Sequence, residues 1–171
     1  MTGLRVGEVI RLDRHDVDFD RGLLVVRNSK LGRCRHVPLH ATTVEALGSY
    51  LCRRDELVST PASPALFIST TGTRLRSGNL RAAFVELLDR AELPPRQGRH
   101  GPRLGDVRHS FAVQTLLDWH VAQLDVGPRL PVLSTFLGHV SPASTYWYLS
   151  ASPPLLAAAA RRVGMTQQVT P

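Results

Sequence analysis

The sequence has few of the residues that stabilise secreted or zinc-bound domains, and its hydrophobic stretches are short. It contains only two cysteines, Cys34 and Cys52, which are too few and too poorly patterned for a disulfide framework or a zinc site. No apolar run approaches the roughly 20 residues that a membrane span needs. Charged residues also interrupt the N-terminal stretch where a signal peptide would need an apolar core. We therefore expect a cytoplasmic protein that is not a membrane protein.

Lysine is almost absent as well. All but one of the 21 Lys and Arg residues are Arg, and the exception is Lys30. A guanidinium keeps its proton at working pH, whereas an ammonium can release one. Lys30 is therefore a candidate general acid. The alternative is that a GC-rich genome replaced lysine by arginine and that Lys30 survived by chance.

The excess of basic side chains gives a formal net charge of +7 and a pI near 10.6. Such a balance favours a polyanionic partner, which is either a nucleic acid or an acidic membrane surface. No basic amphipathic helix stands out, and its absence weakens the membrane alternative. Nucleic acid is the favoured partner.

The spacing of apolar residues predicts an α+β fold, mainly α, with a small antiparallel sheet. The 171 residues suffice for one domain with a substantial core. We expect this domain to cover residues 1–163, followed by a polar tail at 164–171. Thr2, Ser77 and Asp106 are expected helix N-caps. Helices are predicted at residues 2–12, 42–54, 77–91, 106–123, 131–137, from 141 onward and at 155–162, and strands at 22–26, 35–39 and 65–68.

Four segments in order along the chain carry the candidate chemistry. They are TGLRVGE at residues 2–8, NSKLG at 28–32, DVRHSFA at 106–112 and LGH at 137–139, with Tyr148 nine residues after His139. Together they resemble the catalytic domain of the tyrosine recombinase (phage integrase) family. The resemblance extends from Thr2 to about Arg162 and implies DNA recombination or integration of the kind that mobile elements use.

The reaction that this resemblance implies explains the residue types. A tyrosine oxygen attacks the phosphorus of a DNA strand and holds the strand as a 3′-phosphotyrosine ester, which preserves the energy of the broken bond. Bidentate guanidinium groups match the charge that grows on the non-bridging phosphate oxygens. By resemblance, Arg5 and Arg108 are these clamps, Lys30 protonates the departing 5′ hydroxyl, His139 hydrogen-bonds the phosphate and Tyr148 is the nucleophile. The resemblance implies neither a metal nor another cofactor.

Each of these residues also has an ordinary structural interpretation. An isolated Arg is more often a surface or phosphate-positioning cation, and a His at a helix end is more often a simple polar residue. Tyr148 lies beside Tyr146 and a tryptophan, and an aromatic cluster usually packs. The distance from His139 in the sequence favours Tyr148 over Tyr146. Glu8 follows Arg5 by three residues and either orients its guanidinium or forms an ordinary exposed ion pair.

The chain departs from the family pattern in two places. The family usually carries a His three residues before the second Arg, where this chain has Gly105, and losing such a donor typically costs about 10²–10³ in rate. His109 and His100 are the nearby imidazoles, although family members commonly have a His at the position of His109 as well. The second departure is at the N-terminus, where relatives usually have a helical DNA-clamping domain. We expect the start to be truncated.

Two other functions therefore remain open. One is a catalytically impaired remnant of an integrase that still binds double-stranded DNA. The other is a DNA-binding regulator without chemistry, which would need neither Lys30 nor Tyr148. A type IB topoisomerase shares the residue logic, but the segment from His139 to Tyr148 is more similar to a recombinase. By resemblance, the predicted helix at 155–162 mediates self-association on DNA.

Overall fold

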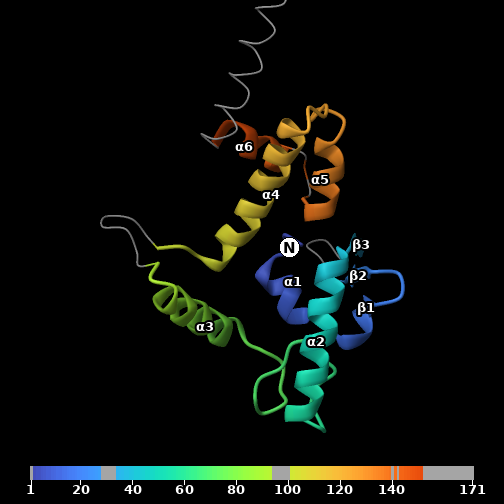
Figure 1. The fold of residues 1–171 in the computed structure, drawn as a ribbon, viewed down its shortest axis with the longest axis vertical. Coiled ribbons are helices and arrows are strands. Elements are labelled where there is room, and N and C mark those ends of the chain that lie inside the picture. The colour runs from blue at the N-terminus through green and yellow to red at the C-terminus, as the bar shows by residue number, and fades with distance from the viewer. Residues whose placement is uncertain (1, 28–33, 94–100, 140, 142, 152–171) are drawn as a thin grey trace, which may run out of the picture. The chain divides into compact units, whose positions relative to one another are not determined.

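The computed structural model describes residues 2–27, 34–93, 101–139, 141 and 143–151, without the side chains of 147 and 149–151. The chain forms two compact units, Met1–Asp106 and Val107–Pro171. Lys30, His100, the predicted helix at 155–162 and the tail at 164–171 lie outside the described residues. Figure 1 shows the elements, which are in chain order α1 (Val6–Arg11), a 3-10 helix (Arg14–Asp16), β1 (Val17–Asp18), β2 (Leu23–Val26), β3 (Arg35–Pro38), α2 (Ala41–Leu57), α3 (Ser77–Arg90), α4 (Leu104–Val121), α5 (Leu130–Leu137) and α6 (Ala143–Ala151).

The first unit is built around a three-stranded antiparallel sheet in the order β1-β2-β3. Val26 pairs with Arg35 and Leu23 with Pro38 in the β2–β3 hairpin. Side chains alternate across a strand, and Leu24, Val26 and Val37 accordingly point into the core. The predicted fold class, a mainly helical domain with a small antiparallel sheet, is confirmed.

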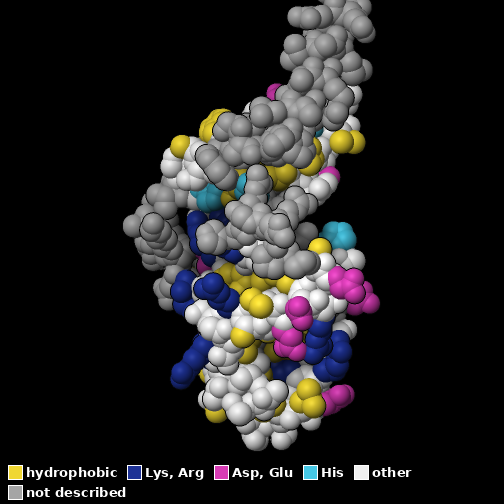
Figure 2. Space-filling view, turned by 90° about the vertical axis from the view of Figure 1, so that its left-hand side faces the viewer, with side chains coloured by type: hydrophobic (Ala, Val, Ile, Leu, Met, Phe, Trp, Pro, Cys, Tyr) yellow, Lys and Arg dark blue, Asp and Glu magenta, His cyan; other side chains and the backbone are white. Residues whose placement is uncertain are grey.

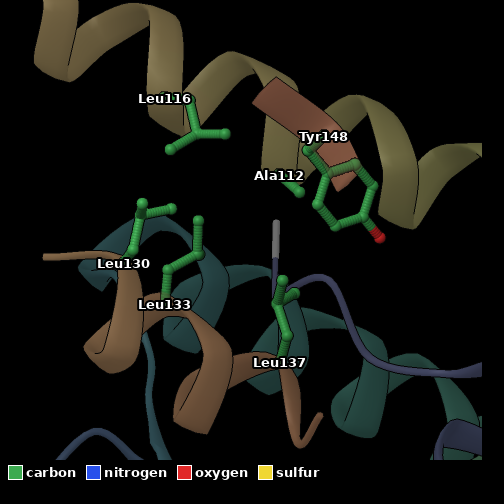
Figure 3. Packing of buried hydrophobic residues seen from close by; sticks show 6 residues of the cluster. All are labelled: Ala112, Leu116, Leu130, Leu133, Leu137 and Tyr148. Carbon is green, nitrogen blue, oxygen red and sulfur yellow. The ribbon is translucent and has the colours of Figure 1, made fainter. Parts of the chain in front are cut away.

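The second unit packs three helices around one apolar cluster. Its buried members are Ala112, Leu116, Leu130, Leu133, Leu137 and Tyr148. Figure 3 shows α4 contributing Ala112 and Leu116 opposite the leucines of α5, with the Tyr148 ring beside Ala112. Gly138 ends α5 in the left-handed conformation, with φ +68°, which glycine adopts without the steric cost of a Cβ.

Several predicted boundaries were wrong. The first helix begins at Val6 rather than after Thr2, because Gly3 has a positive φ of 58° and Arg5 is an extended N-cap. Ser77 is the first residue of α3, and its N-cap is Arg76. Asp106 lies inside the first turn of α4, where Oδ2 accepts a hydrogen bond from the Arg103 N–H at 2.8 Å.

The predicted strand at 65–68 is also wrong. This segment makes only two isolated bridges, Asp13 with Ala65 and Ile68 with Arg74. The first bridge includes the hydrogen bond from the Leu66 N–H to the Leu12 carbonyl, and the buried Arg54 side chain donates to the Ala65 carbonyl. Apolar side chains bury the segment without a neighbouring strand to pair with.

Within the residues that the structure describes, no helix is long and apolar enough to cross a membrane.

Candidate active site

Arg5 is held at the start of α1 by a carboxylate of the same helix. The Glu8 side chain accepts a hydrogen bond from the Arg5 backbone N–H at 2.9 Å and another from the Arg5 guanidinium at 3.0 Å. A carboxylate at this third helical position satisfies a backbone donor that the helix leaves unpaired. Glu8 is only 2% exposed, so the alternative of an ordinary exposed ion pair is wrong. The predicted orienting contact between Glu8 and Arg5 is present.

A second guanidinium, from β3, completes this cluster. Arg35 donates from its two terminal nitrogens to the two oxygens of Glu8, at 3.0 and 2.9 Å, and its side chain is 11% exposed. Burial opposes the ionisation of Glu8, but the hydrogen bonds from Arg35 and Arg5 and their positive charges outweigh it. They lower the pKa of Glu8 from an ordinary 4.5 to about 2. Arg35 was not among the residues predicted from the sequence.

The end of the β2–β3 hairpin that carries Arg35 lies next in sequence to the segment of Lys30, the predicted general acid. Lys30 belongs to residues 28–33, which lie outside the described residues, and β2 and β3 carry the chain into and out of this segment. Both flanks are tied by arginine–carboxylate pairs. Arg35 binds Glu8, and Arg27 donates to Asp16 at 2.6 Å, a contact that raises the pKa of Arg27. These pairs anchor the two strand ends from which the Lys30 segment leaves.

The other candidate residues come together in the second unit. Arg108 of α4 donates to the Leu137 carbonyl at 2.7 Å, at the C-terminal end of α5. The left-handed turn at Gly138 then brings the His139 N–H to the Ser134 carbonyl at 2.9 Å. The Arg108 guanidinium is a cation, and cations are favoured at this negative end of a helix dipole. Arg108 and His139 are therefore both fixed by the last turn of α5.

The Tyr148 ring contacts two imidazoles. Its ring centroid is 5.1 Å from that of His109 and 6.1 Å from that of His139. The Tyr148 and His139 rings are stacked. Tyr148 is 8% exposed, and Figure 3 shows its hydroxyl pointing away from Leu116 and Leu130. Tyr146, two residues earlier on α6, is 52% exposed. The two tyrosines therefore differ in burial, and Tyr148 is the one whose ring contacts the histidines.

Gly105, which occupies the usual family His position, lies in the first turn of α4 and is exposed. A Cβ built on it meets no atom within 4 Å. It lines a hollow of about 800 Å³ in the first unit, together with Val6, Phe84 and Arg103. The backbone and the surroundings of Gly105 therefore leave room for a larger side chain.

The basic charge of the first unit is interspersed with carboxylates. Arg14 pairs with Asp55, and Arg27 with Asp16. On the face drawn in Figure 2, dark blue Arg and magenta acidic side chains lie next to each other on the right, whereas the left edge carries mainly dark blue ones. The net positive charge of the chain is therefore not spread as one continuous field over this face.

Comparison with known proteins assigns the chain to a family. The model of the phage integrase family matches residues 1–153. A putative integrase/recombinase of Sinorhizobium fredii, y4rB, is 45% identical over 164 residues, which are 95% of this chain and 52% of that protein. The chain therefore belongs to the phage integrase family. It spans about half the length of the curated relatives that it matches.

Two crystal structures of tyrosine recombinases share the fold. The XerA recombinase matches with a TM-score of 0.74 and 28% identity, over 99% of this chain and 54% of that one. The XerH site-specific recombinase, in a post-cleavage complex with its palindromic difH substrate, matches with a TM-score of 0.68 and 25% identity over 93% of this chain and 42% of that one.

Proposed function

We propose that this chain is the catalytic part of a tyrosine recombinase, which cleaves and rejoins double-stranded DNA through Tyr148. The observation that carries the proposal is the grouping of Arg108, His139 and Tyr148 around the end of α5, inside a chain of the phage integrase family. A phenol, an imidazole and a guanidinium in one cluster supply a nucleophile and two groups that stabilise charge on a phosphate.

The proposed cleavage step is a phosphoryl transfer to Tyr148. Its phenolic oxygen forms a bond to phosphorus, and the bond from phosphorus to the 5′ oxygen breaks. The phenolic proton passes to water, and Lys30 gives a proton to the departing oxygen. Arg5 and Arg108 bind the non-bridging oxygens, and His139 donates a hydrogen bond to one of them. Rejoining is the reverse reaction with a different 5′ hydroxyl, so no bond energy is lost.

The experiment is a covalent trapping assay. The chain is incubated with a pool of nicked duplexes of randomised sequence, in which the short strand beyond the cleavage site diffuses away after cleavage. Denaturing gels should then show a protein–DNA adduct whose DNA is joined to Tyr148. Tyr148→Phe should form no adduct and should bind the same pool as well as the unchanged protein. An adduct with Tyr148→Phe would contradict the assignment of the nucleophile.

Lys30 has its own test, because its role concerns the leaving group alone. Lys30→Arg keeps the positive charge but cannot release the proton readily, so cleavage should fall by about 10²–10⁴. A 5′-phosphorothiolate substrate, whose leaving sulfur needs no proton, should restore cleavage by Lys30→Ala. DNA binding without rescue would contradict the general-acid role.

A second candidate function is supported by Gly105, which replaces the family His. In that case the chain is an impaired remnant that binds DNA without cutting it, and the trapping assay would give no adduct with any substrate. In both cases, phosphate contacts from Arg should dominate binding, and the affinity should fall steeply with salt. Salt-insensitive, site-specific binding by this chain would contradict both.

Self-association through residues 155–162 and a cytoplasmic location remain part of the proposal.

A further inference from the structure

Thr145 is buried beside the candidate phosphate ligand His139. It lies in the first turn of α6, its exposed fraction is 0%, and its Oγ1 is 2.7 Å from Nδ1 of His139. Tyr148 follows it by three residues, so the two side chains share one face of the helix. This face therefore holds the His139 ring twice, through a hydrogen bond from Thr145 and through stacking with Tyr148.

The direction of this hydrogen bond follows from where the hydroxyl proton can go. Thr115 and Thr135 also lie in helices of the second unit, and each donates its hydroxyl to the carbonyl four residues earlier, at 2.9 Å. Thr145 differs, because Nδ1 of His139 is its only hydrogen-bond partner within the described part of the chain. A buried hydroxyl that does not donate leaves its proton unsatisfied. The hydroxyl of Thr145 therefore donates, and Nδ1 of a neutral His139 accepts.

We propose that Thr145 is a positioning residue that fixes the tautomer of His139. When Nδ1 accepts from Thr145, the single proton of the neutral ring is on Nε2. This inference rests on the proposed function, in which His139 donates a hydrogen bond to a non-bridging phosphate oxygen. Only the Nε2–H tautomer places a donor on the nitrogen that Thr145 does not hold. The opposite tautomer would direct a lone pair at the phosphate and repel it.

The test reads the tautomer directly, by ¹⁵N NMR of the histidine rings of the full chain at pH 8, where an ordinary imidazole with a pKa near 6.5 is neutral. In the unchanged protein, His139 should be entirely the Nε2–H form. Thr145→Val keeps the shape but removes the donor, so His139 should become a mixture of both tautomers. Thr145→Ser keeps the hydroxyl and should restore the single form. A proton on Nδ1 in the unchanged protein, or identical spectra for Val and Thr at position 145, would overturn the inference.

Two further arms separate this inference from a general loss of structure. Thr115→Val removes the hydroxyl of a half-buried threonine of the same unit that makes no hydrogen bond to His139. The His139 signals of this variant should therefore be those of the unchanged protein. In the trapping assay, Thr145→Val should cleave about tenfold more slowly, the effect of one lost hydrogen bond, and Thr145→Ser should cleave normally. If no protein forms an adduct, the proposed function fails, and the tautomer result still decides the role of Thr145.

Discussion

The two units hold their candidate catalytic residues by different physical means. In the first unit, Arg5 is fixed through Glu8, a buried carboxylate that lies between two guanidinium groups. In the second, the Tyr148 ring belongs to an apolar cluster with Leu116 and Leu137, and polar contacts are made at its edge. A residue held by buried charge depends on ionisation and therefore on pH. A residue held by packing depends on the volume of its neighbours.

The largest effect should come from breaking the buried charge cluster. Glu8→Ala leaves Arg35, whose side chain is 11% exposed, without its carboxylate. Removing one partner of a buried pair typically costs about 3–5 kcal/mol, so the first unit should be destabilised by about 4 kcal/mol. Hydrogen exchange of the β2 and β3 amides measures this directly.

Two variants control that measurement. Glu8→Ala combined with Arg35→Met removes both charges and should recover most of the lost stability. Leu116→Ala, in the core of the second unit, should cost about 3 kcal/mol through lost burial and a cavity. Both tryptophans, Trp119 and Trp147, lie in the second unit, so fluorescence follows Leu116→Ala. If Glu8→Ala alone and Glu8→Ala combined with Arg35→Met destabilised the first unit equally, the unpaired charge of Arg35 would not be the cause of the lost stability.

The next largest effect should come from acid, which is expected to destabilise the first unit more than the second. The folded-state pKa of Glu8 is about 2 against an ordinary 4.5, a difference that corresponds to about 3 kcal/mol at 1.36 kcal/mol for each pKa unit. Because the folded pKa is the lower one, this stability is fully present above pH 4.5 and is lost as the pH falls through 2. Hydrogen exchange should show the β2–β3 hairpin weakening over that range, and Glu8→Gln should weaken less over it. A hairpin whose stability is the same at pH 5 and pH 2 would contradict the role of Glu8.

The sequence predicted contacts between near neighbours and missed those between distant segments. The pairing of Arg5 with Glu8 follows from a spacing of three residues on a helix, and the choice of Tyr148 over Tyr146 follows from the family spacing. Arg35 lies 27 positions from Glu8. Its place at the start of a predicted strand indicates a polar residue but not its carboxylate partner. Thr145 was missed although it is six residues from His139, because the turn at Gly138 and the start of α6 bring the two together.

Errors in the predicted elements have the same origin. The segment 65–68 has the composition of a strand, but its backbone bonds to single residues in α2, in the loop after α1 and at Leu75. Nothing in four apolar residues indicates that their partner is a side chain such as Arg54. Thr2 has the chemistry of an N-cap, yet the positive φ of Gly3 delays the helix to Val6. Local propensity could not reveal this.

Gly105→His should raise cleavage if the missing family His impairs the reaction. A Cβ at position 105 meets no atom within 4 Å, so the backbone there accepts a side chain. One restored donor is typically worth about 10²-fold in rate, measured as the rate of adduct formation in the trapping assay. Gly105→Phe is the matched control, because it adds a ring of similar shape without a donor. An equal gain from Phe, or a loss with His, would indicate that the site is organised around another donor such as His109.

The smallest effect should come from Tyr146→Phe, which removes the other phenol of α6. Tyr146 is 52% exposed and Tyr148 is 8% exposed, so removing the hydroxyl of Tyr146 leaves the apolar cluster and the stacking on His139 unchanged. Surface substitutions of this kind usually change stability by no more than about 0.5 kcal/mol. Cleavage by Tyr146→Phe should therefore proceed at the rate of the unchanged protein, whereas Tyr148→Phe forms no adduct. If Tyr146→Phe abolished the adduct and Tyr148→Phe retained it, the packed tyrosine would be a core residue, and the nucleophile would be the exposed one.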